Sequence, residues 1–245
     1  MINQIASDTV LNHAYEWLCK QRQDYSPNND VWDLRRRWAD FKPSLQAKLM
    51  AGEYEFSSLD RIHTDKGEVI DLWQSADALV LKAMSIVLGQ HLAPMLSPNC
   101  YHIKGRGGLK GAVRAAINAL EPDSYVMKSD VKSYYASIDH YILYEQVEQF
   151  VDDKTVLRLL WGYLKHCVVD GGNYINISRG ISLGCLLSPL MGALYLKPLD
   201  DAMAALDVTY IRFMDDWLIV VPTRWKLRRV VRTTNQILNA HRTTP

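Results

Sequence analysis

Residues 210–221 read YIRFMDDWLIVV, an apolar run that contains Arg212 and, at its middle, the adjacent acids Asp215 and Asp216. Short apolar runs rich in β-branched and aromatic residues predict strands, and Asp favours turns. The stretch therefore predicts two short antiparallel strands with both acids at the tight turn between them. Adjacent carboxylates repel each other, so one interpretation is a bound divalent cation. The other interpretation is that Asp serves only to form the turn.

A second acidic motif, SDVKSYY at residues 129–135, places Asp130 at the end of a strand predicted over residues 125–131. Two aromatic residues, Tyr134 and Tyr135, follow this acid closely along the chain. Taken alone, the motif favours a simpler role, because Asp often caps the helix that follows a strand.

Between the two acidic motifs, residues 180–190 read GISLGCLLSPL, a loop with two glycines that leads into a helix. Ser188 is a good N-cap, and Pro189 suits the first helical position. Glycine permits a close approach of the backbone to a flat ligand such as a base pair. An ordinary connection between a strand and a helix would have the same pattern, so the loop alone does not indicate a ligand.

The order of these three motifs resembles that of the bacterial reverse transcriptases, including those of group II introns and retrons. In that family an Asp is followed five residues later by an aromatic residue, then by a loop resembling G-x-P-Q-G-x-x-x-S-P, and then by Y/F-x-D-D. Asp130 and Tyr135 match the first motif, and residues 213–216 match the third. The positions that match the loop are Gly180, Gly184, Ser188 and Pro189. The resemblance covers roughly residues 50–240.

The resemblance implies an α+β fold with reverse-transcriptase-type fingers and palm, in which the palm is an antiparallel sheet with packed helices. It also implies an RNA-directed DNA polymerase that works on an RNA template, a DNA primer and deoxynucleoside triphosphates. Two alternatives stay open. One is another palm-type nucleotidyltransferase, and the other is a catalytically weak or silent remnant that binds nucleic acid or a partner.

Transfer of a nucleotide to a primer 3′-hydroxyl uses two metal ions, one at the attacking oxygen and one at the leaving pyrophosphate. Asp130 and Asp215 are the predicted ligands shared by both ions, and Asp216 is predicted to support the site. The resemblance adds the backbone carbonyl of Val131 as a further ligand. Oxygen ligands favour Mg²⁺, with Mn²⁺ as a substitute.

Tyr135 matches the aromatic sugar gate of the family, which implies deoxynucleotide substrates; core packing is the alternative, and it is the preferred role for Tyr134. The resemblance also implies nucleotide contacts at Leu183 and Gly184, because the family places a Gln that touches the incoming nucleotide at the position of Leu183. Ser182 stands where the family has Pro. Because Leu cannot form a hydrogen bond, the contacts to the nucleotide must differ in detail from those of the family.

Residues 54–73 predict two strands around a turn at Asp65-Lys66-Gly67. The family binds the triphosphate with basic residues on such a hairpin, and Arg61, His63 and Lys66 are available here. Ile70 stands about where the family places an Arg, which weakens this assignment.

The formal net charge of +1 does not indicate a nucleic-acid-binding protein, so any such surface must come from local clusters. One candidate is a basic loop with four glycines at residues 104–111, and another is one face of a predicted helix at residues 224–239. The opposite face of that helix is apolar, with Trp225, Leu227, Val231 and Leu238 among its residues. A solvated surface is the alternative for both. The predicted nucleic-acid contacts are Lys104, Arg106, Lys110, Arg224, Arg228 and Arg232.

We expect residues 1–124 to form mainly the fingers, with N-terminal helices, the hairpin and the basic glycine loop. Residues 125–245 should form mainly the palm with the metal site, with a helical and hairpin insertion at 136–175. Relatives continue after the last helix into another strand and a helical thumb, so we expect the chain to stop before the thumb and to work poorly alone. Further helices are predicted over residues 11–18, 31–50, 76–95, 113–120, 141–165 and 188–206.

The remaining features indicate a cytoplasmic protein that does not contact a membrane. The four cysteines are scattered without zinc-ligand spacing, and the N-terminus lacks the pattern of a signal peptide. Apolar runs such as residues 217–221 are too short to cross a bilayer.

Overall fold

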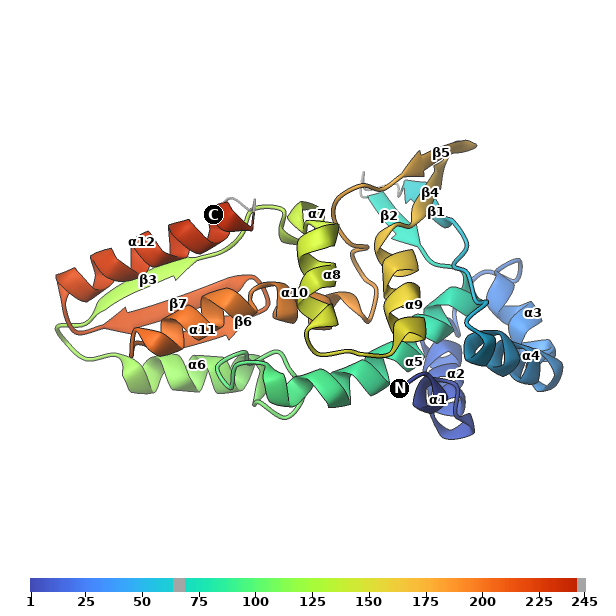
Figure 1. The fold of residues 1–245 in the computed structure, drawn as a ribbon, viewed down its shortest axis with the longest axis horizontal. Coiled ribbons are helices and arrows are strands. Elements are labelled where there is room, and N and C mark those ends of the chain that lie inside the picture. The colour runs from blue at the N-terminus through green and yellow to red at the C-terminus, as the bar shows by residue number, and fades with distance from the viewer. Residues whose placement is uncertain (64–68, 242–245) are drawn as a thin grey trace. The chain divides into compact units, whose positions relative to one another are not determined.

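The structure is a computed structural model that describes residues 1–63 and 69–241 (Figure 1). The chain folds into two compact units, and each unit is built from two separate stretches of sequence. Unit 1 combines Met1–His91 with Val147–Ser188, and unit 2 combines Leu92–Gln146 with the chain from Pro189 onward. Each unit contains a sheet and helices, so the fold is of the predicted α+β class.

The predicted boundary between fingers and palm at residue 124 does not coincide with these units. Residues 92–124, which were predicted as part of the fingers, belong to unit 2, where Asn99 and Tyr101 extend the edge of the sheet. The N–H of Arg212 donates to the Asn99 carbonyl at 2.9 Å, and the N–H of Tyr101 donates to the Arg212 carbonyl at 2.8 Å. The helix and hairpin of residues 147–176 belong instead to unit 1.

The N-terminal part of unit 1 is helical. Its second helix buries Leu11, Ala14 and Leu18, which confirms the predicted amphipathic helix. The helix predicted over residues 31–50 is instead two helices separated at Arg37. The helices are α1 (Ile2–Ile5), α2 (Asp8–Gln21), α3 (Asp30–Arg36) and α4 (Trp38–Ala51).

The long apolar helix α5 (Ser75–Leu92) and the short 3-10 helix η1 (Ala93–Met95) follow, and they confirm the predicted end near Pro94. Within the described ranges, the stretch Ser75–Met95 has the length and composition of a membrane-spanning helix. The sequence prediction, which considered only uninterrupted apolar runs, did not identify this stretch. Leu79, Met84 and Leu88 of α5 are fully buried, so this helix packs as a core element.

The sheet of unit 1 joins two hairpins that are far apart in sequence. Its strands are β1 (Leu59–His63), β2 (Val69–Leu72), β4 (Cys167–Asp170) and β5 (Asn173–Asn176), in the order β2-β1-β4-β5. Both hairpins were predicted, and the parallel pairing of β1 with β4 that joins them was not. The turn predicted at Asp65-Lys66-Gly67 lies outside the described residues. Helix α9 (Lys154–Leu164) precedes β4 and buries its apolar face.

The sheet of unit 2 is antiparallel, with the strand order β3-β7-β6. It consists of β3 (Tyr125–Ser129), β6 (Thr209–Phe213) and β7 (Asp216–Val221). Its helices are α6 (Gly108–Ala119), α7 (Tyr134–Ser137), α8 (His140–Glu148), α10 (Ser188–Tyr195), α11 (Lys197–Ala205) and α12 (Arg224–Ala240). Contacts of α11 with β6, and of α12 with β3, β7 and α11, show that these two helices cover the sheet side by side.

Three further helical predictions need correction in detail. The helix predicted over 141–165 is divided into α8 and α9, and the one predicted over 188–206 is divided at Leu196. The last helix buries Val230, Thr234 and Leu238, whereas Trp225 and Val231, both predicted on its apolar face, are 74% and 37% exposed. Trp225 and Val231 therefore lie outside the face that packs on the sheet.

Candidate active site

The turn between β6 and β7 carries the acidic pair. Because Phe213 is paired with Asp216, only Met214 and Asp215 form the turn, and Asp216 is the first residue of β7. The prediction that both acids occupy the turn is therefore right for Asp215 alone. Met214 has a φ of +57°, a left-handed conformation that costs energy for a residue with a side chain.

Asp130 emerges beside this turn. Strand β3 pairs with β7, with its last residue, Ser129, opposite Trp217, so that Asp130, the residue after the strand, lies next to the end of the β6–β7 hairpin. Burial raises the pKa of Asp215, and the negative charges of Asp216 and Asp130 raise it further. The structure thus brings the two acidic motifs of the sequence to one end of the unit 2 sheet.

The metal-binding capacity of this end of the sheet rests on a small set of oxygens. Across residues 1–63 and 69–241, no three His, Cys, Asp or Glu side chains lie close enough together to hold an ion. Mg²⁺ is commonly bound by one or two carboxylates together with substrate phosphates, rather than by a cage made of protein alone. Asp130 and Asp215, whose like charges interact, fit that mode of binding. The carbonyl of Val131 stays a predicted ligand.

Arg212, the other charged residue of the motif, does not neutralise the acidic pair directly. Its guanidinium is fully buried and donates from Nε to Asp200 Oδ1 at 2.7 Å. Tyr210 donates to the same carboxylate oxygen at 2.9 Å. Burial alone would lower the pKa of Arg212, and the Asp200 carboxylate more than offsets this effect, so the pKa lies well above its ordinary value. Arg212 also donates from Nη1 to the carbonyl of Met214 at 2.9 Å, which holds the turn.

Tyr135 lies near the acidic turn and packs on helix α10. Burial raises the pKa of Tyr135 to about 12, and the charge of Asp215 contributes to the shift. A Cβ at Gly192 would lie 3.0 Å from the Tyr134 ring and 3.3 Å from the Tyr135 ring, so the absence of a side chain there admits both rings. Tyr134 is buried, as expected of a core residue. The sugar-gate role of Tyr135 stays a prediction.

The predicted nucleotide contacts Leu183, Gly184, Arg61 and His63 all belong to unit 1. Leu183 is 72% exposed, and Gly184 has a φ of +85° in the loop. Leu183 and Gly184 therefore lie on the surface of unit 1, where a ligand can reach them.

The two basic candidates on β1 already have acidic partners. Arg61 makes two hydrogen bonds to Asp71, of 2.8 and 2.9 Å, and His63 Nε2 lies 3.1 Å from Asp170 Oδ1. A triphosphate would have to compete with these carboxylates for both side chains. Lys66 lies outside the described residues.

Among the predicted nucleic-acid contacts, one differs from the rest. Arg106 is half-buried and donates to the backbone carbonyls of Leu96, at 3.0 Å, and Ala93. It therefore orders its own loop, and its use in binding would require release of these bonds. Arg228 lies over the ring of Trp225, 4.9 Å from its centroid. The exposed candidates are Lys104, Lys110, Arg224, Arg228 and Arg232.

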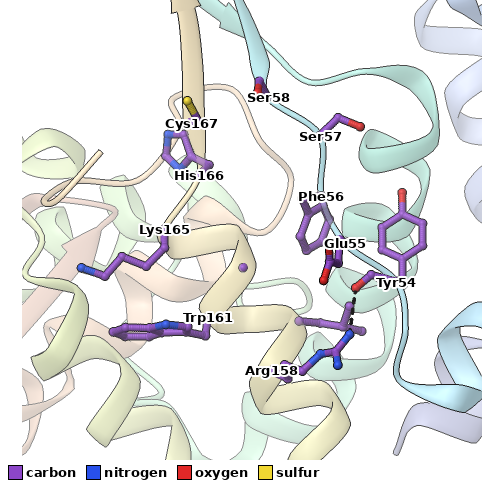
Figure 2. A pocket seen from close by; sticks show the side chains of 12 residues that line it. Tyr54, Glu55, Phe56, Ser57, Ser58, Arg158, Trp161, Lys165, His166 and Cys167 are labelled. Carbon is purple, nitrogen blue, oxygen red and sulfur yellow. Dashed lines mark hydrogen bonds between the residues drawn. The ribbon is translucent and has the colours of Figure 1, made fainter. Parts of the chain in front are cut away.

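Sequence reasoning missed a pocket of about 410 Å³ in unit 1 (Figure 2). Figure 2 shows Trp161 and Lys165 extending from helix α9, and the segment of residues 54–58 passing beside it. Arg158, also on α9, donates to the carbonyl of Tyr54 at 3.4 Å. Arg158 of α9 and Lys165, the residue that follows this helix, lie seven positions apart, or about two helical turns, and this spacing was the available signal. No function is assigned to the pocket.

The comparison with protein families decides the identity of the fold. Residues 74–244 match the family described as "Reverse transcriptase (RNA-dependent DNA polymerase)". The chain belongs to the reverse transcriptase family. The fold and the family that the three motifs predicted are thereby confirmed.

Similar proteins include protein YkfC of Escherichia coli K12, which is 24% identical over 176 residues, or 68% of this chain and 46% of that protein. The group II intron-encoded protein LtrA of Lactococcus lactis subsp. cremoris is 22% identical over 136 residues, or 56% of this chain and 23% of that protein. The chain thus spans less than half the length of these two relatives.

Among solved structures, a chain of a partial Cas6-RT-Cas1–Cas2 complex superposes with a TM-score of 0.59. The match covers 97% of this chain and 42% of the other, at 17% sequence identity. At this identity the similarity shows a shared fold.

Proposed function

We propose that this chain extends a DNA primer on an RNA template, using deoxynucleoside triphosphates and Mg²⁺ bound at Asp130 and Asp215. The observation that carries the proposal is the electrostatic interaction of these two carboxylates at the end of the unit 2 sheet. The carboxylates come from separate motifs, 85 positions apart, so a turn-forming or capping role for each one alone does not account for their meeting. Membership of the reverse transcriptase family supports the same chemistry.

The residues of unit 2 have separate roles in this proposal. Asp130 and Asp215 hold the cations, Asp216 adds negative charge from the start of β7, and the Val131 carbonyl is a further ligand. Bound cations would stabilise the negative charge on the attacking 3′ oxygen and on the leaving pyrophosphate. Tyr135 limits the space beside the sugar, and exclusion by steric overlap selects deoxynucleotides.

Contacts to template and primer are proposed for the exposed basic residues of the glycine loop and of α12. Phosphate contacts supply most of the sequence-independent affinity for nucleic acid and make it dependent on salt. The residues concerned are Lys104, Lys110, Arg224, Arg228 and Arg232.

A second candidate function is binding of nucleic acid without catalysis. The observation that favours it is that the described residues contain no ready-made cluster of three metal ligands. Primer extension distinguishes the two functions, because a non-catalytic binder would retain a template–primer duplex without lengthening it.

The test is extension of a labelled DNA primer on an RNA template with Mg²⁺, by the wild-type chain and by single variants. We expect Asp130→Asn and Asp215→Asn to abolish extension while the fold is kept. Asp152→Asn, a change at an exposed acid outside both motifs, is the matched control and should retain wild-type activity. Wild-type rates in Asp215→Asn would contradict the proposal, and binding without extension by the wild type would favour the second function.

A further inference from the structure

His102 connects two of the three sequence motifs within unit 2. It lies in the loop before α6 and is half-buried. Its Nδ1 accepts the backbone N–H of Met214 at 2.9 Å, and its Nε2 lies 3.2 Å from the carbonyl oxygen of Pro189. The ring also contacts Phe213 edge to face, with centroids 6.0 Å apart. The side chain therefore links the start of α10 to the acidic turn.

These two hydrogen bonds require one form of the ring. A backbone N–H needs a lone pair on Nδ1, and a carbonyl needs a proton on Nε2, so the ring must be neutral with its proton on Nε2. Burial lowers the pKa of His102 to about 4, and the nearby positive charges of Arg212 and Arg106 act in the same direction. Cys100 Sγ lies 3.4 Å from Nδ1, and burial raises the pKa of that thiol to about 11, so no thiolate competes for a proton.

Met214 is the residue whose position matters most for Asp215. It adopts the left-handed conformation, with a φ of +57°, and unlike glycine it does so at a cost. Both of its polar backbone groups form hydrogen bonds with side chains. His102 accepts from its N–H, and Arg212 donates to its carbonyl.

We propose that His102 is a positioning residue for catalysis, which fixes the Met214 peptide and thereby the direction in which Asp215 presents its carboxylate beside Asp130. The inference rests on the proposed polymerase function. Displacement of a reacting group by about 1 Å can reduce a rate by about 100-fold. A hydrogen bond that sets the turn therefore acts on the rate far more than on the binding of nucleotide.

The two hydrogen bonds can be separated by substitution. In His102→Asn, the side-chain oxygen can occupy the place of Nδ1 and accept from Met214. In His102→Gln, the longer side chain can place its NH₂ group near the Pro189 carbonyl and leaves the Met214 N–H without its acceptor. His13→Asn, at an exposed position of α2, is the matched control for the change of residue type.

The experiment measures kcat and KM for a deoxynucleotide, together with the melting temperature, for the wild type and the three variants. We expect His102→Gln to lower kcat by about 10- to 100-fold with KM nearly unchanged, and His102→Asn to stay within about threefold of wild type. His13→Asn should be unchanged. Equal losses in the Asn and Gln variants that follow their melting temperatures would show a merely structural role and would overturn the inference.

A second measurement does not depend on activity. Hydrogen exchange of the Met214 amide, followed by NMR, should accelerate in His102→Gln and stay slow in His102→Asn, and equal exchange in both would also overturn the inference. Asp215→Asn separates this result from failure of the proposed function. If Asp215→Asn extends primers normally, the polymerase assignment fails; if it is inactive while His102→Gln is normal, only the role of His102 fails.

Discussion

Two hairpins of this chain each close with a two-residue turn, and the two turns are built by different means. In unit 1, Asp170 pairs with Asn173, and the two residues between them are Gly171 and Gly172, both with positive φ. In unit 2, the turn between Phe213 and Asp216 has no glycine, and Met214 takes the left-handed conformation.

The difference lies in what holds each turn. The glycine turn follows from residue type, because glycine reaches positive φ without steric cost. At the other turn, the Met214 N–H donates to His102 and Arg212 donates to the Met214 carbonyl, and the fold brings both side chains to the turn. Strained backbone of this kind persists where the surrounding structure determines it, and such places are often functional. We infer that the second turn is held in one position because the carboxylate of Asp215 has to be held in one position.

The largest expected effect comes from the buried ion pair under the second turn. Arg212→Met should lower the free energy of unfolding by about 3–5 kcal/mol, because the buried Asp200 carboxylate would lose its compensating charge. Arg61→Met, beside the glycine hairpin, should cost about 1 kcal/mol or less, because its ion pairs are partly exposed. Urea denaturation measures both. Equal losses would show that the two hairpins are supported in the same way.

Acid should weaken unit 2 through His102. The pKa of this ring lies at about 4 in the fold, against an ordinary value of 6.5, so the unfolded chain binds the proton more readily. The contribution of His102 to the free energy of unfolding is therefore fully present above pH 6.5. It is lost as the pH falls through 4, and for this half-buried group the loss is roughly 2 kcal/mol.

The comparison of wild type with His102→Asn isolates this contribution from the other groups that titrate in the same range. The positive charges that act on the ring are those of Arg212 and Arg106, and Cys100 stays protonated in this range. The difference in the free energy of unfolding between the two proteins should change between pH 6.5 and 4. A constant difference would contradict the assignment of a neutral ring.

The two turns should differ in how much stability a substitution at their first, positive-φ position costs. Gly171→Ala should cost about 1 kcal/mol, since φ is +56° and nothing lies within 4 Å of the added Cβ, so the whole cost is conformational. Met214→Gly should cost less than this, because relief of the left-handed strain offsets the greater freedom of glycine in the unfolded chain. Thermal unfolding of both variants checks the ranking, and a greater loss for Met214→Gly would mean that Met214 is not strained.

The smallest expected effect concerns the charge of Asp215. Because the pKa of this carboxyl is raised by burial and by Asp216 and Asp130, its ionised form destabilises the fold at neutral pH in the absence of metal. Asp215→Asn should therefore raise the melting temperature in chelator, and Mg²⁺ should stabilise the wild type more than this variant. A lower melting temperature for Asp215→Asn in chelator would contradict this account.

Sequence reasoning reached those features that depend on nearby residues. The hairpin around Asp215, the strand before Asp130, the buried face of α2 and the glycine hairpin follow from periodicity and turn chemistry over a few positions. The motif order then supplied the family, which local patterns alone could not.

The features that were missed depend on contacts between distant residues. His102 is 112 positions from Met214, and nothing in its local sequence indicates that partner. The parallel pairing of Leu59 with Val168 joins two correctly predicted hairpins, and its register has no local signal. Arg212 lies within the acidic motif, yet its ion-pair partner is the buried Asp200 of α11, twelve positions earlier in the chain.

The central claim is that Asp130 and Asp215 together hold the catalytic cation. The most direct measurement is the anomalous diffraction of Mn²⁺ in crystals of the chain with an RNA–DNA template–primer and a non-hydrolysable deoxynucleotide. We predict a peak within about 2.3 Å of a carboxylate oxygen of each residue, at the distances of hard-cation ligands. A peak bound elsewhere, or a bound nucleotide with no cation at these two carboxylates, would contradict the account.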